Sequence, residues 1–269
     1  MMLSRLNKTI RRLKSNCPNL FFDKKALLSQ ERDRFNKYGW DEESALLKLN
    51  TVLQLIEQDD YEDSVSRHGL LFSAISMCEK VSSILEIGTY KGESTILLSH
   101  IFPQAKILTI DLPSDDVVFQ NTYGGSRGTP TRLSTYMDTR NRNIDRKNIQ
   151  AIEGNSFFLP SLCNKSYDLI WVDGGHLFPD VSWDICNAYN SCNVGGHILI
   201  DDVLERGVDL KTDKASSDSR KLLDSLKSRE GIDVDYFLKR TNEKLIERRV
   251  SRKYIGVIRK QEMKRLVGA

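Results

Sequence analysis

The stretch at residues 83–94, SILEIGTYKGES, limits most strongly what this chain can fold into. Its apolar run at 84–87 predicts a buried strand, the glycines Gly88 and Gly92 predict a turn, and a helical pattern begins at Ser94. A strand, a glycine turn and a helix in that order let the backbone approach a ligand and present unpaired N–H groups at the helix start. We therefore expect a nucleotide-type binding site here.

The rest of the chain alternates between strand and helix patterns. Strands are expected at 84–87, 106–110, 149–153, 168–172, 197–200, 235–239 and 253–259, and helices at 94–101, 131–142, 156–162, 178–191 and 218–229. Such alternation predicts a Rossmann-like, doubly wound α/β fold, whose mostly parallel seven-stranded sheet is covered by helices on both faces. The last two strands lie close together in the chain, so we expect them to pair antiparallel at one edge of the sheet.

Helices are expected to precede the first strand. They fall at 24–38, at 41–58 with Asp41 as N-cap, and at 66–78. Residues 1–15 have basic and apolar residues at helical spacing, which predicts an amphipathic helix packed on its own domain or on a partner subunit; contact with anionic lipid or another polyanion is the alternative. We expect residues 1–65 to form an extension that caps a site or joins subunits into a homo-oligomer, and residues 66–269 to form the binding domain.

Composition narrows the class of partner and the compartment. The net charge of +3 is too small to argue for nucleic acid, and no apolar run reaches membrane-spanning length. The five cysteines are scattered and lack metal-ligand spacing. With no secretory signal, they are expected to be reduced thiols in a cytoplasmic protein.

Polar residues follow the expected strands where each one ends. They are Glu86, Asp111, Gly154-Asn155-Ser156, Asp173 and Asp201-Asp202. Ligands of parallel sheets bind outside the carboxyl ends of the strands, so these residues mark the predicted site. The spacing Gly88-x-x-x-Gly92 does not fit a dinucleotide fingerprint, whereas Asp111 is placed to accept both hydroxyls of a ribose. A nucleoside without phosphates is the better ligand.

Residues 85–94 resemble motif I of the class I S-adenosylmethionine-dependent methyltransferases, most closely the metal-dependent O-methyltransferases of the catechol and macrolide-sugar types. The resemblance covers about residues 67–260. It implies that S-adenosylmethionine is the cofactor and that the following residues bind it: Gly88 and Gly92 along the methionine end, Tyr90 near the sulfonium, Glu86 and Ser94 at the amino-acid moiety, Asp111 at the ribose, Asn155 and Ser156 at the adenine, and Asp173 beside it.

Three carboxylates, Asp173, Asp201 and Asp202, follow strands that should be neighbours. They would repel one another without a cation, and oxygen ligands suit Mg²⁺, or Mn²⁺, which would lower the pKa of a bound hydroxyl. The alternative is that Asp201 and Asp202 cap the following loop and bind no metal. The three positions match the metal ligands of the family, and the acid at Asp202 resembles the sugar type, since the catechol type has asparagine there. His176 matches a histidine base of the sugar type, so we expect it to act as general base with Asp173 beside it.

The expected function is therefore S-adenosylmethionine-dependent, Mg²⁺-assisted methylation of a hydroxyl on a small molecule or sugar. A metal-independent N-methyltransferase acting on nucleic acid or protein is one alternative, although Val-Asp-Gly-Gly-His at 172–176 differs from the Asn/Asp-Pro-Pro-aromatic motif of many such enzymes. A non-catalytic nucleoside-binding assembly subunit is another. The long polar segment 113–148 is expected to form a lid or else to be partly disordered. Four of its side chains could contact the substrate: Tyr123, Arg127, Arg132 and Tyr136.

Overall fold

The computed structural model describes residues 24–59, 61, 66–121, 130–207, 211–212, 215–229, 232–246 and 249–262. The amphipathic helix expected over 1–15, together with Tyr123 and Arg127, lies outside the described residues. The α-helices are α2 (Lys24–Lys37), α3 (Glu42–Leu55), α4 (His68–Cys78), α5 (Glu93–Ile101), α6 (Val117–Asn121), α7 (Pro130–Ile144), α8 (Leu159–Leu162), α9 (Asp180–Ser191) and α10 (Ser217–Lys227). The strands are β1 (Ser83–Ile87), β2 (Lys106–Asp111), β3 (Ile149–Glu153), β4 (Tyr167–Val172), β5 (Cys192–Leu204), β6 (Lys211–Thr212), β7 (Ala215–Ser216), β8 (Ile232–Ile246) and β9 (Arg249–Lys260).

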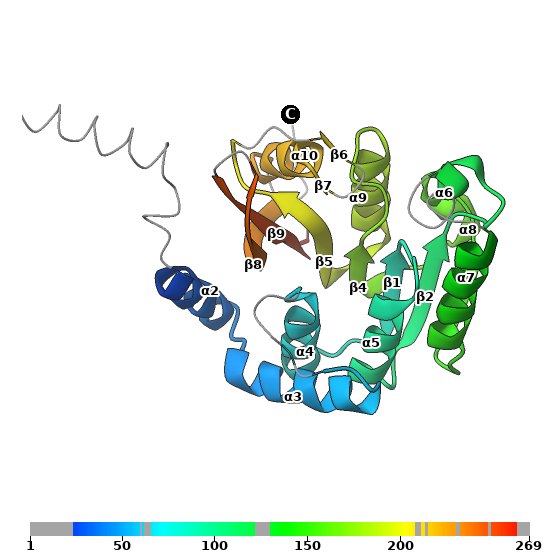
Figure 1. The fold of residues 1–269 in the computed structure, drawn as a ribbon. Helices are drawn as coiled ribbons and strands as arrows, with labels where there is room; N and C mark the ends of the chain where they lie inside the picture. The colour runs from blue at the N-terminus through cyan, green and yellow to red at the C-terminus, as the bar shows by residue number, and fades with distance from the viewer. Residues whose placement is uncertain are drawn as a thin grey trace, which may run out of the picture.

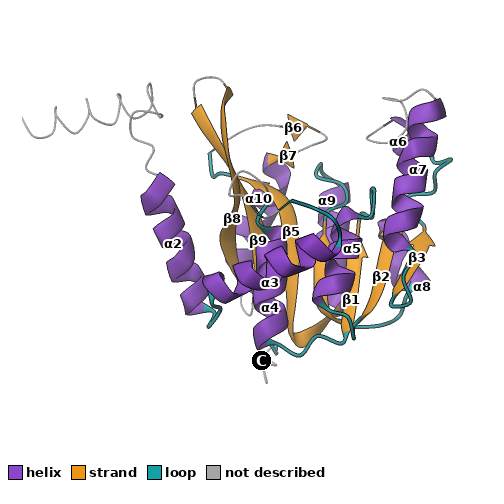
Figure 2. Cartoon of the chain, turned by 60° about the horizontal axis from the view of Figure 1, so that its bottom comes forward, coloured by secondary structure: helices purple, strands orange, loops and turns teal. Residues whose placement is uncertain are grey.

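One sheet runs through the centre of the molecule (Figure 1). Its seven main strands lie in the order β3-β2-β1-β4-β5-β9-β8, and β9 is antiparallel to both of its neighbours. The first five strands of that order are parallel to one another. The short strands β7 and β6 form a hairpin that joins β5 beside Val203 (Figure 2). The predicted Rossmann-like fold with an antiparallel strand near one edge is confirmed.

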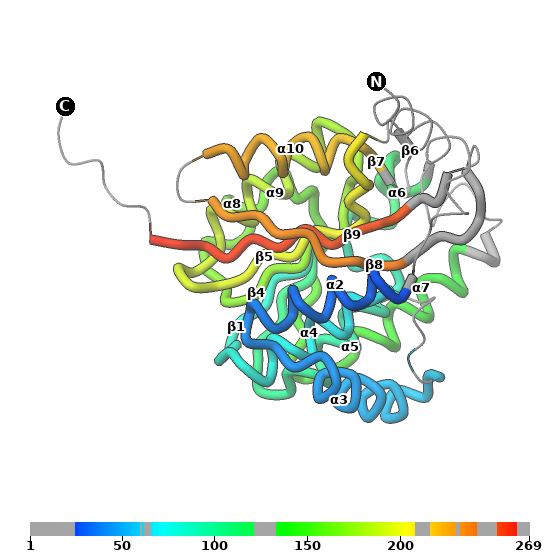
Figure 3. Tube along the Cα trace, turned by 90° about the vertical axis from the view of Figure 1, so that its left-hand side faces the viewer, coloured from blue at the N-terminus to red at the C-terminus, as the bar shows by residue number. Residues whose placement is uncertain are grey.

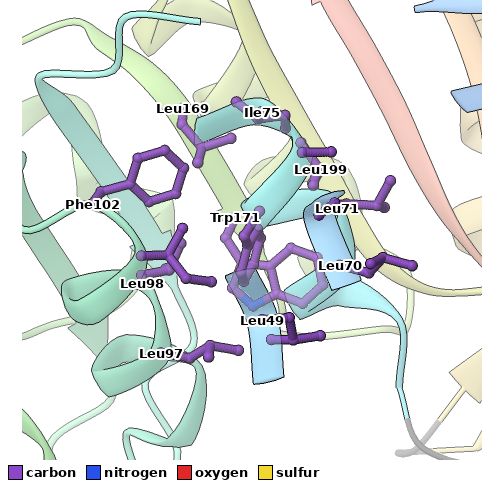
Figure 4. Close-up of a cluster of buried hydrophobic side chains, with 14 of the residues drawn as sticks. Leu49, Leu70, Leu71, Ile75, Leu97, Leu98, Phe102, Leu169, Trp171 and Leu199 are labelled. Carbon is purple, nitrogen blue, oxygen red and sulfur yellow. The ribbon is translucent and has the colours of Figure 1, made fainter. Parts of the chain in front are cut away.

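Helices cover both faces of the sheet. Because side chains alternate along a strand, Ile84 joins a core with α3, α4 and α5, while Leu85 joins a second core with α8, α9 and α10. The first core surrounds Trp171 of β4, whose ring lies edge-on to Phe72 with centroids 5.2 Å apart. Leucines from α4 and α5 close around the same indole (Figure 4).

Helix α3 packs on the first face, whereas α2 contributes Phe35 to the first core and Leu27 to the second. Helix α2 runs alongside β8 (Figure 3), where the backbone N–H of Leu238 donates to Glu31 Oε2 at 2.6 Å. Asp41 caps α3 as predicted, since its Oδ1 accepts from the Glu43 N–H at 3.0 Å. The proposed division between an extension at 1–65 and a domain at 66–269 stays a prediction. None of the described helices is long and apolar enough to cross a bilayer.

Strand β5 differs from its prediction. It extends past the expected end at residue 200, so that Asp201 and Asp202 lie within the strand. The register against β9 shifts here: Ile200 pairs with Gly256 and Val203 with Tyr254, which leaves the two aspartates as a bulge. Asp202 has a left-handed backbone, with φ of 50°. A bulge redirects side chains without ending the strand, which explains the extra length.

Candidate active site

The glycine turn after β1 brings two strand ends into direct contact. Gly88 has φ of 98°, and a Cβ placed on it would lie 2.3 Å from the carbonyl oxygen of Asp173. The Asp173 N–H donates in turn to the carbonyl of Ile87 at 2.8 Å. Gly92, also left-handed with φ of 72°, is the N-cap of α5. Because only glycine leaves room for the Asp173 carbonyl at this position, the end of β1 and the loop after β4 can lie against each other.

Glu86 lies in the interior behind this turn. Its Oε2 accepts hydrogen bonds from the hydroxyls of Thr95 and Thr109, the second at 2.6 Å. Burial raises the pKa of Glu86 to about 7, which the two hydroxyls oppose. Within the described residues Oε1 has no hydrogen-bond partner. A contact between Glu86 and the cofactor stays a prediction.

The raised pKa of Glu86 makes stability depend on pH. The folded chain binds this proton more tightly than the unfolded chain, so the resulting stabilisation is complete below pH 4.5 and is lost as pH rises through 7. Relative to Glu86→Gln, the wild-type free energy of unfolding should fall by about 2–3 kcal/mol between pH 5 and pH 8. Urea denaturation at both pH values measures this. Glu93→Gln, at an exposed position of α5, is the control. Parallel profiles for wild type and Glu86→Gln would contradict the assignment.

Asp111 ends β2 beside the same turn. Its carboxylate accepts from the Tyr90 N–H at 2.7 Å and from the Leu112 N–H at 2.8 Å, so the group is held at the edge of the sheet. The Arg140 guanidinium on α7 lies 4.0 Å from Asp111 Oδ2. Burial raises the pKa of Asp111, and Arg140 opposes that rise. The predicted ribose acceptor and an arginine thus share one corner of the site.

Helix α7, from the predicted lid segment, closes over this corner. The ring of Tyr136 lies edge-on to that of Tyr90, with centroids 5.2 Å apart, and Phe119 of α6 contacts it from another side at 5.7 Å. The sequence analysis named Tyr136 as a possible substrate contact but did not single out Arg140. The sequence did contain a signal for Arg140, because residues four apart, such as Tyr136 and Arg140, lie on one face of a helix.

The ends of β3 and β4 are joined by Asp184, which sequence reasoning also missed. This buried carboxylate of α9 accepts a hydrogen bond from the Ser156 hydroxyl. Its Oδ2 would lie 2.7 Å from a Cβ on Gly174. Burial raises the pKa of Asp184 to about 6. Asn155, the residue before Ser156, caps the 3₁₀ turn Ser156–Phe158, where its Oδ1 accepts from the Phe157 N–H at 2.9 Å. The adenine contacts predicted for Asn155 and Ser156 stay predictions.

His176 lies between two of the predicted acids. Its Nε2 is 3.8 Å from Asp173 Oδ1 and 3.9 Å from Asp202 Oδ2. Burial lowers the pKa of His176, and the nearby Asp202 and Asp201 carboxylates oppose that shift. A neutral imidazole beside the Asp202 carboxylate can accept a proton and then be stabilised as a cation, so the arrangement suits a general base.

Two lysines that the sequence reasoning missed bind the other acids. Lys239 Nζ donates to Asp201 Oδ2 and, at 2.8 Å, to Asp202 Oδ1, while Lys253 Nζ donates to Asp202 Oδ2 at 2.8 Å. Burial alone would raise the pKa of Asp201, but the Lys239 ammonium brings it well below its usual range. In the sequence, Lys239 ends the apolar run Tyr236-Phe237-Leu238, which was the only local signal.

The predicted Mg²⁺ or Mn²⁺ does not fit this arrangement. Three of the four carboxylate oxygens of Asp201 and Asp202 already accept hydrogen bonds from ammonium groups, so a metal would have to displace them. Among the residues that the structure describes, no group of three or more His, Cys, Asp and Glu side chains is placed to hold a metal ion. The structure therefore brings Asp173, Asp201 and Asp202 to one place, as predicted, but surrounds two of them with lysines.

The strand order, the glycine turn after β1 and the acid ending β2 fit a Rossmann-like methyltransferase fold. Residues 85–203 match the family model described as "Methyltransferase domain". An O-methyltransferase from Bacillus cereus, solved in complex with SAH, is similar in structure, with 16% identity, coverage of 81% of this chain and 91% of that one, and a TM-score of 0.50. The O-methyltransferase TomG from Streptomyces achromogenes, solved with SAM, has 16% identity over 89% of this chain and 99% of its own, with a TM-score of 0.49. No curated protein matches the sequence. The family model supports the methyltransferase resemblance seen at residues 85–94, and the metal-dependent O-methyltransferase type stays a prediction.

Proposed function

We propose that this chain uses S-adenosylmethionine to methylate a hydroxyl oxygen on a small molecule or sugar. The observation that carries the proposal is the contact between the Gly88 turn and the Asp173 backbone, because it sets the cofactor turn directly beside the loop that bears His176. The O-methyltransferase from Bacillus cereus, which was solved with SAH, supports it through its fold.

The cofactor would lie across the carboxyl ends of β1, β2 and β3. Gly88, Gly92, Tyr90 and Ser94 would bind its methionine end, and Asp111 would accept its ribose hydroxyls. The backbone N–H groups of Tyr90 and Leu112 each bind one oxygen of Asp111, and a carboxylate oxygen can accept more than one hydrogen bond. When bound, S-adenosylmethionine supplies a methyl group on a positively charged sulfur.

His176 would remove the proton of the acceptor hydroxyl. That oxygen forms a bond to the methyl carbon as the carbon–sulfur bond breaks, the electron pair goes to sulfur, and the hydroxyl proton ends on His176. The Asp202 carboxylate lies close enough to stabilise the imidazolium that results. Holding both reactants in line is the larger contribution expected of the protein.

Metal assistance is the part of the expected mechanism that this proposal leaves out. Three of the four carboxylate oxygens of Asp201 and Asp202 accept hydrogen bonds from Lys239 and Lys253. No step is therefore assigned to Mg²⁺ or Mn²⁺. The acceptor class, a homo-oligomer built through the N-terminal helices, and a cytoplasmic location stay predictions.

An acceptor screen tests the proposal. The purified chain is incubated with S-adenosylmethionine and sets of sugars, glycosides and phenols, and release of S-adenosylhomocysteine is followed by a coupled assay. We expect release with at least one hydroxylated acceptor and a product that carries the methyl on oxygen. A methyl found on nitrogen, or release only with nucleic acid or protein, would instead support the N-methyltransferase alternative. A chain that binds no S-adenosylmethionine would support the non-catalytic one.

A further inference from the structure

We infer that Lys239 provides, from within the fold, the positive charge that metal-dependent O-methyltransferases obtain from a divalent ion at this acidic cluster. The cluster here means Asp173, Asp201 and Asp202. What this means for catalysis rests on the proposed function, whereas the occupancy of the cluster by lysine can be tested without any turnover.

The contacts of Lys239 are those of a buried cation. Its side chain is 7% exposed, and its ammonium bonds both Asp201 and Asp202. Lys253 binds the remaining oxygen of Asp202. A hard divalent ion binds carboxylate oxygens directly, so it would compete with these two lysines for the same atoms.

Two irregularities in the sheet aim these side chains at one another. The bulge in β5 contains Asp201 and Asp202. A second shift of register, in β8, falls at Lys239, because Leu238 pairs with Tyr254 and Arg240 with Lys253. The carbonyl of Lys239 also accepts from the Arg67 N–H at 3.0 Å, which ties it to the start of α4. Bulges are a common means of redirecting a side chain beside a site, and here they fix both partners of the ion pair.

The charges around the cluster also favour lysine over a divalent ion as its cation. The Asp202 carboxylate contacts three cationic groups: the ammonium groups of Lys239 and Lys253, and Arg240, whose Nη2 lies 4.0 Å from Asp202 Oδ1. Asp201 is paired with Lys239 as well, so both of these carboxylates already have cationic partners, and a divalent ion would add an uncompensated double charge. Buried sites of that kind are costly.

In catalysis Lys239 acts as a positioning residue. By holding the Asp202 carboxylate, it keeps Oδ2 of that residue 3.9 Å from His176 Nε2. The base is then oriented by an acid that is itself anchored by a lysine. Lys239 does not contact the reacting atoms in this scheme.

Manganese titration tests the inference. Free Mn²⁺ is followed by its paramagnetic resonance signal, and the melting temperature is recorded with Mg²⁺ and with EDTA. Wild type should bind no Mn²⁺ and show no thermal shift. Lys239→Met removes the charge but keeps the bulk, so it should lower the melting temperature by roughly 10 °C, because buried carboxylates lose their partner. Mn²⁺ should then bind that variant and restore much of the loss.

The controls separate charge from packing. Lys106→Met, at an exposed position on β2, should change neither measurement, and Lys239→Arg should bind no Mn²⁺. Stoichiometric binding by wild type that is lost in Asp201→Asn would overturn the inference, as would a folded Lys239→Met variant that binds no Mn²⁺. If Lys239→Met does not fold, the wild-type and Lys239→Arg titrations decide. A wild type that behaves as expected here but releases no S-adenosylhomocysteine with any acceptor rejects only the proposed function.

Discussion

Replacing His176 by alanine should lower kcat by about 10²–10⁴-fold, the usual contribution of a positioned general base. The imidazole is the titratable group that lies between Asp173 and Asp202, and it belongs to the loop held against the Gly88 turn. A base acts only as the proton moves, so the KM for the acceptor should change little. Affinity for S-adenosylmethionine, measured by calorimetry, should stay at the wild-type value and show that the site is intact.

His100→Ala is the matched control for this substitution. His100 is in the last turn of α5, away from the acidic cluster, and its removal should leave kcat unchanged. Turnover by His176→Ala within a few fold of wild type would show that another group takes the proton. The role of general base would then have to be withdrawn.

Gly88→Ala should lower the free energy of unfolding by about 3–5 kcal/mol. The new methyl group would meet the carbonyl oxygen of Asp173 at 2.3 Å, and that backbone cannot retreat without breaking the hydrogen bond between the Asp173 N–H and Ile87. The positive φ of 98° adds strain of its own. Any relaxation would separate β1 from the loop after β4, so binding of S-adenosylmethionine should weaken as well. Urea denaturation and calorimetry measure the two effects.

Gly195→Ala distinguishes the contact from the backbone strain. Gly195 also has a positive φ, 84°, but nothing lies within 4 Å of the position of a Cβ. Its substitution should cost only about 1–2 kcal/mol, the backbone penalty alone. Equal costs at the two positions would mean that the close approach at Gly88 has no special role.

The fold could be predicted because its signals are local. Strand β1 is a short, mostly apolar run followed by a glycine, β2 is one that ends at an acid, and Asp41 marks the start of α3 as its N-cap. The extent of β5 could not be predicted in this way. Its bulge depends on pairing with β9, and the residues that impose the shift of register, Tyr254 to Gly256, come much later in the chain.

The residues of the candidate site also separate into those with a local sequence signal and those placed by long-range pairing. Gly88 and Asp111 follow directly from the motif after β1 and from the end of β2, whereas Lys239 is separated from Asp201 by 38 positions. A cluster of acids in a sequence requires a cation but does not say which kind, since an ammonium group and a divalent ion both satisfy it. Only the tertiary structure, which brings β8 close to β5 across β9, supplies the answer.

Calorimetric titration of the chain with S-adenosylmethionine, together with Asp111→Ala, tests the central claim most directly. Wild type should bind one molecule per chain. The variant loses a charged acceptor for the ribose hydroxyls, so its affinity should fall by about 100-fold. A wild type that binds no S-adenosylmethionine, or an Asp111→Ala variant that binds it equally well, would contradict the site described here.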